Sequence, residues 1–325
     1  MQILSLPAMT PVASCPGGGV WVLGFFDGVH SGHQALLAAA GSLAEQTAGA
    51  VGVWTFDALP KAGELLTDGT ERAKLLGAYG VRWLVTESFG AVSHLSGEAF
   101  FRDVLLNRFA PSAIVCGFNF RFGANGACSA EDLVRWGKEA GVMVHVETPC
   151  LRDARPVSST WIRSLVREGD MEKAAELLTR PYGIAGIVEH GKALGRKLGF
   201  PTANLRLPQR KIAPSRGIYA CTVRFADASG QPVTKMGVCN IGSRPTVNGD
   251  AADITVETWI LDFTGDLYGK TLEIAFVKKI REEKRFDSLE ALKAQVYRDA
   301  DAVRQYFAGK TESGKHGTGG CSFTI

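Results

Sequence analysis

The chain has 325 residues, of which 46% are hydrophobic and 21% charged, and its formal net charge is +3. The length predicts two globular domains, and so small a charge gives no argument for nucleic-acid or membrane binding. Seven cysteines, at positions 15, 116, 128, 150, 221, 239 and 321, form no CxxC pair. This usage argues against a disulfide framework or a zinc site. With no leader pattern or apolar span, it predicts a cytoplasmic protein.

The first half of the sequence alternates short apolar runs with stretches of helical spacing. Strands are predicted at Val20–Phe25, Ala50–Phe56, Trp83–Thr86, Ala113–Gly117 and Met143–Val146, and helices at Gln34–Thr47, Glu71–Tyr79, Gly97–Phe109 and Ala130–Ala140. Strands separated by helices imply a parallel sheet with right-handed crossovers, as in a Rossmann-like α/β domain. Ligands of such sheets gather at the carboxyl ends of the strands.

The turn after the first predicted strand carries the motif His-x-Gly-His, from His30 to His33, preceded by Gly24, Phe25 and Asp27. Backbone N–H groups at a helix N-terminus attract anions, and imidazoles there can stabilise charge that develops on a phosphate. Two solvent-facing histidines at a helix cap would be the simpler interpretation, but the strand–turn–helix context favours a phosphate site. The segment resembles the ATP-binding motif of the nucleotidyltransferase superfamily.

A second motif, Ser-Ser-Thr-Trp-Ile-Arg at 158–163, lies at the start of a predicted helix over Trp161–Val166. Serine or threonine at such a position can simply cap the helix. The functional interpretation is that the hydroxyls of Ser159 and Thr160 and the planar fork of Arg163 converge on a triphosphate. Paired with the upstream histidines, the segment is similar to the Ser-Ser-Thr-x-Ile-Arg motif of the same superfamily.

The pattern changes after a helix at Asp170–Leu178 and the turn Arg180–Gly183, so domains are predicted at 1–180 and 181–309. Strands follow at Ile184–Glu189, Ile218–Phe225, Lys235–Ile241, Ile254–Leu261 and Thr271–Val277. This run of strands favours a mostly antiparallel β-barrel, closed by one amphipathic helix at Asp287–Phe307. Residues 310–325, rich in Gly, Ser, Thr and Lys, are expected to be disordered.

The most specific motif is Gly-Arg-Lys-Leu-Gly-Phe-Pro-Thr-Ala-Asn, from Gly195 to Asn204. Glycines let a loop wrap phosphates closely, Lys197 adds a cation, and Thr202 and Asn204 supply neutral oxygens that suit Mg²⁺. A turn between strands would be the simpler interpretation. The motif resembles that of riboflavin kinase, as do Arg180–Gly186, Asn240–Thr246 and Val256–Phe263.

From about Val20 to Phe307 the motifs occur in the order seen in the bacterial bifunctional riboflavin kinase/FMN adenylyltransferase (FAD synthetase) family, which the chain resembles. The resemblance implies an N-terminal adenylyltransferase domain and a C-terminal kinase barrel. Such enzymes convert riboflavin to FMN with one ATP and FMN to FAD with a second, releasing pyrophosphate. The implied partners are riboflavin, FMN, ATP and Mg²⁺, with no nucleic acid or membrane; oligomeric state is not predicted.

In the kinase, the resemblance assigns Gly195 and Lys197 to ATP binding, and Thr202 and Asn204 to Mg²⁺ and the ATP phosphates. It makes Glu257 the general base on the ribityl 5′-hydroxyl. Taken alone, the alternation of Glu257 with apolar neighbours predicts only an outward-facing strand residue.

In the adenylyltransferase, the FMN phosphate would attack the α-phosphorus of ATP directly, so orientation and charge neutralisation are enough. The resemblance places the following residues at ATP: Gly24, Phe25, Asp27, His30, His33, Ser159, Thr160 and Arg163. The two histidines would contact the phosphates, and Arg163 the leaving pyrophosphate.

Two flavin-binding positions are also assigned by the resemblance. Asn119 lies in a segment where the family carries Asp or Asn, although the aromatic residues 118, 120 and 122 could equally form one face of a buried strand. Arg281 matches a Leu-Arg segment near the flavin, whereas its charged neighbours could equally form a solvated run.

The chain departs from the family at three places. Ala58-Leu59-Pro60 stands where Pro-His-Pro is frequent, residues 124–129 carry no charge where basic residues are frequent, and Trp259 replaces a common His. Two alternatives therefore stay open: a riboflavin kinase whose other domain is weakened or uses another acceptor, and a flavin-responsive regulator without turnover. Intact Thr202, Asn204 and Glu257 argue against the regulator.

Overall fold

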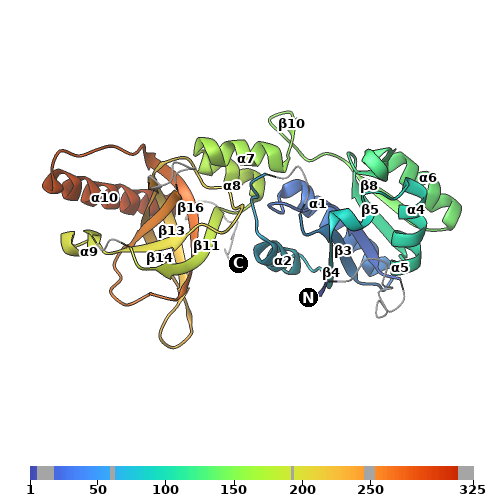
Figure 1. The fold of residues 1–325 in the computed structure, drawn as a ribbon, viewed down its shortest axis with the longest axis horizontal. Coiled ribbons are helices and arrows are strands. Elements are labelled where there is room, and N and C mark those ends of the chain that lie inside the picture. The colour runs from blue at the N-terminus through green and yellow to red at the C-terminus, as the bar shows by residue number, and fades with distance from the viewer. Residues whose placement is uncertain (6–17, 59–62, 192–193, 245–252, 314–325) are drawn as a thin grey trace. The chain divides into compact units, whose positions relative to one another are not determined.

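The computed structural model describes residues 1–5, 18–58, 63–191, 194–244 and 253–313 (Figure 1). The chain divides into two compact units, Met1–Ser159 and a second that begins at Thr160. This division falls after the first residue of α7 (Ser159–Glu168) and ahead of α8 (Met171–Leu178), whereas the sequence predicts a domain that ends at 180. They fall in the second unit because the buried side of α8 packs against two strands of the barrel.

The first unit is built on a six-stranded, wholly parallel sheet in the order β1-β4-β3-β2-β5-β8. The strands are β1 (Gln2–Ser5), β2 (Val20–Leu23), β3 (Val51–Phe56), β4 (Trp83–Glu87), β5 (Ala113–Gly117) and β8 (Met143–Glu147). The five predicted strands are confirmed within a few residues, and β1 is an addition at the edge. The predicted α/β class is thus confirmed.

The helices of this unit connect the parallel strands. They are α1 (Ser31–Gln46), α2 (Gly69–Ala78), α3 (Phe89–Val92), α4 (Gly97–Ala99), the π-helix η1 (Phe100–Leu106), α5 (Asn107–Phe109) and α6 (Ala130–Ala140). A 3₁₀ turn, η2 (Ala124–Gly126), and two short hairpins, β6 (Arg121–Phe122) with β7 (Cys128–Ser129) and β9 (Leu151–Arg152) with β10 (Arg155–Pro156), complete it. The helix predicted over Gly97–Phe109 has those bounds, but its middle is π-helical.

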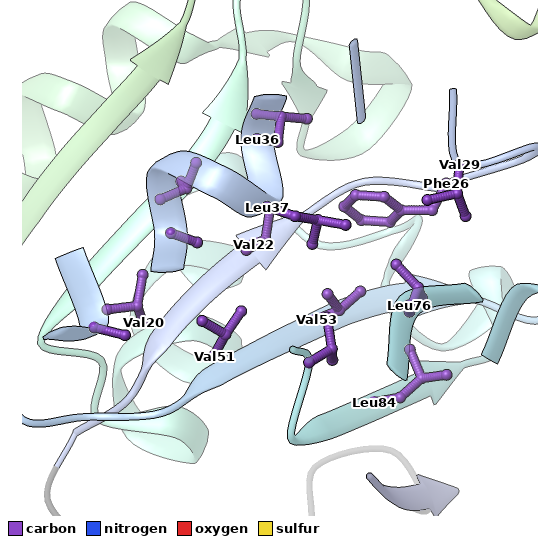
Figure 2. Packing of buried hydrophobic residues seen from close by; sticks show 14 of the residues in the cluster. Val20, Val22, Phe26, Val29, Leu36, Leu37, Val51, Val53, Leu76 and Leu84 are labelled. Carbon is purple, nitrogen blue, oxygen red and sulfur yellow. The ribbon is translucent and has the colours of Figure 1, made fainter. Parts of the chain in front are cut away.

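The sheet is covered on both faces, as the alternation of side chains along β2 shows. Val20 and Val22 pack with Leu37 of α1 and Leu76 of α2 (Figure 2). Trp21 packs on the opposite face, with η1 and α6. Strands buried on both faces are apolar throughout, which is why this part of the sequence reads as unbroken apolar runs.

The second unit contains a closed antiparallel barrel in the order β11-β12-β15-β14-β13-β16. The strands are β11 (Tyr182–Glu189), β12 (Thr202–Arg206), β13 (Gly217–Ala226), β14 (Pro232–Arg244), β15 (Asp253–Ile260) and β16 (Thr271–Arg281). In addition to α7 and α8, this unit contains the helices α9 (Leu194–Leu198) and α10 (Leu289–Ser313). The barrel and its five predicted strands are confirmed. Residues 310–313 are helical rather than disordered, and 314–325 lie outside the described residues.

The two faces of β15 have different surroundings. Val256, Thr258 and Ile260 are buried and face the barrel interior. Glu257 and Trp259 alternate with them and so lie on the outer face, where α10 covers the barrel. Glu257 therefore faces outward, as the simpler interpretation predicts, and it lies beneath α10.

Among the described residues, no helix is long and apolar enough to cross a membrane.

Candidate active sites

The turn between β2 and α1 has an unusual backbone. Phe26 and Val29 have positive φ angles of 57° and 41°, and both side chains are fully buried. A β-branched residue in the left-handed region is strained unless its surroundings hold it there. Burial supplies that restraint, and the strained turn brings the backbone round to the N-terminus of α1.

Asp27 holds this turn in place. Its carboxylate is 2% exposed, and its Oδ1 accepts hydrogen bonds from the backbone N–H groups of Leu66 (2.8 Å) and Thr67 (3.1 Å). Thr67 Oγ1 in turn accepts from Gly28 N at 3.0 Å. Ser159 Oγ donates to the carbonyl oxygen of Asp27 at 2.9 Å. Asp27 thus ties the turn to the segment before α2, and Ser159 joins it from the second motif.

The two histidines stack at the beginning of α1. His30 is the N-cap, its ring centroid lies 3.7 Å from that of His33, and His30 Nδ1 accepts from His33 N at 3.4 Å. Burial lowers the pKa of the His33 imidazole well below its ordinary value, and the nearby His30 lowers it further. Among the residues that the structure describes, His33 Nδ1 is buried without a hydrogen-bond partner. The pair therefore presents an uncharged imidazole at a helix N-terminus.

Arg72 of α2 is a residue of this site that sequence reasoning missed. Its guanidinium donates to the carbonyl oxygens of Phe25 (3.1 Å) and Phe56 (2.9 Å) and lies 4.9 Å from the Phe25 ring centroid. Burial lowers the pKa of Arg72, opposed by Asp27 and other nearby carboxylates. It joins the loop after β2 to the last residue of β3, and these segments meet only in the folded chain. Gly24 donates to Trp54 O at 3.3 Å in the same layer.

Thr160 and Arg163, the other predicted ATP contacts, belong to the second unit. Both lie near the start of α7, where Arg163 Nη2 donates to Thr160 Oγ1 at 3.2 Å. Trp161 and Ile162 between them are buried, so the polar pair occupies the solvent side of the helix. The Thr160 hydroxyl and the Arg163 guanidinium are thus brought together, whereas the Ser159 hydroxyl is hydrogen-bonded to the Asp27 carbonyl oxygen.

The predicted flavin residue Asn119 lies in an exposed turn at the carboxyl end of β5. Phe118 beside it is 46% exposed, and its N–H donates to Glu147 O at 3.1 Å. Phe120 and Phe122 instead pack into the core. The buried-face interpretation of the aromatic residues therefore holds for 120 and 122 and fails for 118, which is left as an exposed ring beside Asn119.

The kinase motif assembles on three neighbouring strands of the barrel. Register places Glu257 of β15 opposite Asn204 of β12 on one side and Asn240 of β14 on the other. Two residues further along β15, Trp259 lies opposite Thr202. Residues directly opposite one another share a face of the sheet, so these side chains form one polar row beneath α10.

A cavity of about 280 Å³ lies along this row. Its wall includes Thr202, Asn240, Glu257, Trp259 and Arg281. Trp259, which replaces a histidine common in the family, thus lines the cavity. Its ring centroid lies 6.0 Å from that of Phe200 and 5.5 Å from that of Tyr297 in α10.

Arg281 lines the same cavity but already has a partner. Its guanidinium donates to both carboxylate oxygens of Asp299 in α10, at 2.9 and 2.7 Å. Asp299 is 2% exposed and also accepts from Gln295 at 2.9 Å. A two-pronged contact of this kind is among the stronger ion pairs, so Arg281 fastens α10 over the cavity.

A second cavity of similar size begins on the other side of Thr202. Its wall includes Arg196, Phe263 and Tyr268; Arg196 Nη2 lies 3.3 Å from the Tyr268 hydroxyl, and the His190 ring stacks on Tyr268 at 3.8 Å. Thr202 lines both cavities. A hydroxyl between two cavities is placed where groups bound in each would meet.

The glycine motif has a different local structure from the predicted phosphate loop. Gly195 and Lys197 lie in the short helix α9, with Gly195 on the wall of the first cavity and Lys197 exposed. Asn204 Nδ2 donates to Thr202 O at 3.3 Å, and a Cβ on Gly191 would meet that amide at 2.5 Å. The absence of a side chain at Gly191 thus lets the chain pass directly over Asn204.

The described residues contain no cluster of three or more His, Cys, Asp or Glu that could hold a metal ion. Thr202, Asn204 and Glu257 instead provide a hydroxyl, an amide and a carboxylate on adjoining strands. Mg²⁺ is commonly bound by one or two carboxylates together with substrate phosphates, and these oxygen groups fit that pattern.

Comparison with known proteins agrees with the two domain types. Residues 13–161 match the family model described as FAD synthetase, and residues 178–307 match that described as riboflavin kinase. The chain is 37% identical over 296 residues to the bifunctional riboflavin kinase/FMN adenylyltransferase of Pseudomonas fluorescens, covering 88% of this chain and 92% of that one. It is 36% identical over 299 residues to the enzyme of the same name from Escherichia coli K12, covering 89% and 93%. A crystal structure of a protein named macrolide-efflux protein, from Streptococcus pneumoniae, aligns with a TM-score of 0.83 and 29% identity over 93% of this chain and 98% of that one.

Proposed function

Because the chain belongs to the bifunctional riboflavin kinase/FMN adenylyltransferase family, we propose that it makes FAD from riboflavin in two ATP-dependent steps. The barrel phosphorylates riboflavin to FMN, and the parallel-sheet domain transfers AMP from a second ATP to FMN, releasing pyrophosphate. The observation that carries the kinase assignment is that Thr202 lies between two cavities, one of which contains Glu257.

In the kinase step, riboflavin occupies the cavity beneath α10 and ATP the cavity beside Arg196 and Tyr268. Glu257 accepts the proton of the ribityl 5′-hydroxyl as its oxygen bonds to the γ-phosphorus, and the bond to ADP breaks. Little deprotonation is needed early in such a transfer, so positioning and charge stabilisation provide most of the rate. Arg281 and Asp299 keep α10 closed over the flavin.

Thr202 and Asn204 would hold Mg²⁺ together with the ATP phosphates. When bound, the cation neutralises charge on the phosphate oxygens. Glu257 lies opposite Asn204 across the strand pair, so the base and the phosphate-binding amide are neighbours. Gly195 and Lys197 of α9 flank the same phosphates, with Lys197 as an added positive charge.

In the adenylyltransferase step, the phosphates of ATP lie at the N-terminus of α1 against His30 and His33. An oxygen of the FMN phosphate attacks the α-phosphorus, and the bond to pyrophosphate breaks without a covalent enzyme intermediate. Backbone N–H groups and the uncharged His33 donate to the developing charge. Ser159, Thr160 and Arg163 receive the leaving pyrophosphate.

The altered loops of this domain leave one alternative open, a kinase whose other domain is weakened or uses a different acceptor. Residues 59–60 lie outside the described residues. Segment 124–129 has no charged residue of its own, but Arg121 Nε of the neighbouring strand β6 donates to Gly126 O at 3.1 Å. A guanidinium therefore lies against this loop. With Phe118 exposed beside Asn119, this favours an acceptor with an aromatic ring system and a phosphate. FMN has both features.

The thiols suit the reducing cytoplasm that we infer as the location of the enzyme. Free cysteines among the described residues are Cys116, Cys128, Cys150, Cys221 and Cys239.

The test is to incubate the protein with riboflavin, ATP and Mg²⁺ and to separate the flavins. FAD supports both activities, FMN alone supports the weakened alternative, and unchanged riboflavin would contradict both. His30→Ala should stop FAD formation and leave FMN formation intact, whereas Glu257→Gln should stop phosphorylation while supplied FMN still becomes FAD. Equal loss of both activities in either variant would contradict the division of labour.

A further inference from the structure

We propose that Asn240 is a substrate-binding residue of the kinase, whose amide oxygen accepts a hydrogen bond from the ribityl hydroxyl next to the one that is phosphorylated. This inference rests on the proposed function. Asn240 begins the segment Asn240–Thr246, which resembles riboflavin kinase, but the resemblance gave this residue no role of its own.

Strand register places Asn240 beside the general base. Asn240 of β14 pairs with Glu257 of β15, and Glu257 pairs in turn with Asn204 of β12. Directly opposite residues have Cβ atoms about 5 Å apart and point to the same face. The amide and the carboxylate can therefore reach neighbouring hydroxyls of one extended polyol chain.

The second observation is an unsatisfied acceptor. Asn240 Oδ1 is buried and has no hydrogen-bond partner among the described residues, although Asn240 lines the cavity beneath α10. A buried polar atom without a partner destabilises a fold unless something else satisfies it. Inside a cavity that receives a ligand rich in hydroxyls, a substrate O–H is the natural donor.

The neighbouring residues on the same face of β14 define the surroundings of Asn240. Gly242, two positions along the same face of β14, has no side chain; a Cβ there would meet Glu283 Oε1 at 2.8 Å and Asn240 Nδ2 at 3.4 Å. Val238, two positions the other way, presents an apolar wall to the same cavity. Asn240 thus lies between the Glu283 carboxylate, which covers Gly242, and the apolar side chain of Val238, and a few polar groups in an apolar wall fix the orientation of a ligand.

The experiment measures KM and kcat for riboflavin by total FMN and FAD formed, and the inhibition constant of lumiflavin, which has the flavin ring without hydroxyls on its side chain. Asn240→Leu should raise KM for riboflavin about fivefold to tenfold, the effect of one lost hydrogen bond. It should leave lumiflavin inhibition within about twofold. Asn240→Asp, which keeps an acceptor oxygen, should raise KM less than Asn240→Leu.

The matched control is Thr258→Val, which also removes a buried polar atom, but on the interior face of β15. It should leave KM for riboflavin unchanged. An unchanged KM in Asn240→Leu, or equal weakening of riboflavin and lumiflavin, would overturn the inference. Wild-type protein that forms no FMN would overturn the proposed function itself, and this inference with it.

Discussion

Replacing Asp27 by alanine should destabilise the first unit and impair FAD formation selectively. The carboxylate accepts two hydrogen bonds from buried backbone N–H groups, of Leu66 and Thr67. Alanine would leave both donors without an acceptor, at about 1–3 kcal/mol each, so the unfolding free energy should fall by about 2–6 kcal/mol. Asp27→Asn keeps an acceptor oxygen in the same place and should lose less.

The assay is urea unfolding followed by tryptophan fluorescence, because the first unit contains Trp21, Trp54, Trp83 and Trp136. Activity is measured separately as FMN formed from riboflavin and FAD formed from supplied FMN. The second reaction should be slower in Asp27→Ala, since the turn that carries the histidines loses its anchor, whereas the first should be unchanged. A loss of stability under about 1 kcal/mol, or equal losses for alanine and asparagine, would refute the reasoning.

Two further predictions follow from lowered and raised pKa values. Because the folded pKa of His33 lies below its unfolded value, the unfolded chain binds more protons as pH falls below about 6.5, and the first unit should lose stability there. His33→Gln should show a smaller loss between about pH 7.5 and 5.5 in thermal unfolding, and an unchanged loss would contradict the assigned cause. Burial raises the pKa of Cys239 to about 12, so this thiol should resist iodoacetamide in the native protein while the partly exposed Cys150 reacts, as peptide mass spectrometry would show. Equal labelling of the two would contradict this prediction.

Most elements could be predicted because their signals are local. The buried strands β2 and β5 are short apolar runs bounded by glycine or proline, and α6 shows helical spacing throughout, so their bounds are confirmed closely. β12 was missed because Thr202–Arg206 lacks apolar alternation and follows a proline. It becomes a strand through hydrogen bonds to β11 and β15, and pairing of this kind overrides local preference.

Local sequence patterns and motifs were enough to predict the two domain types, the order of the motifs and the residue types that each chemistry requires. Folding of the whole chain was needed to place Thr202 between two cavities and Glu257 between Asn204 and Asn240, and to pair Arg281 with Asp299. The reason is physical: periodicity and turn chemistry act over a few residues, whereas strand register and helix packing join residues far apart in the chain. Which side chains share a face of the barrel is settled only when those long-range pairs form.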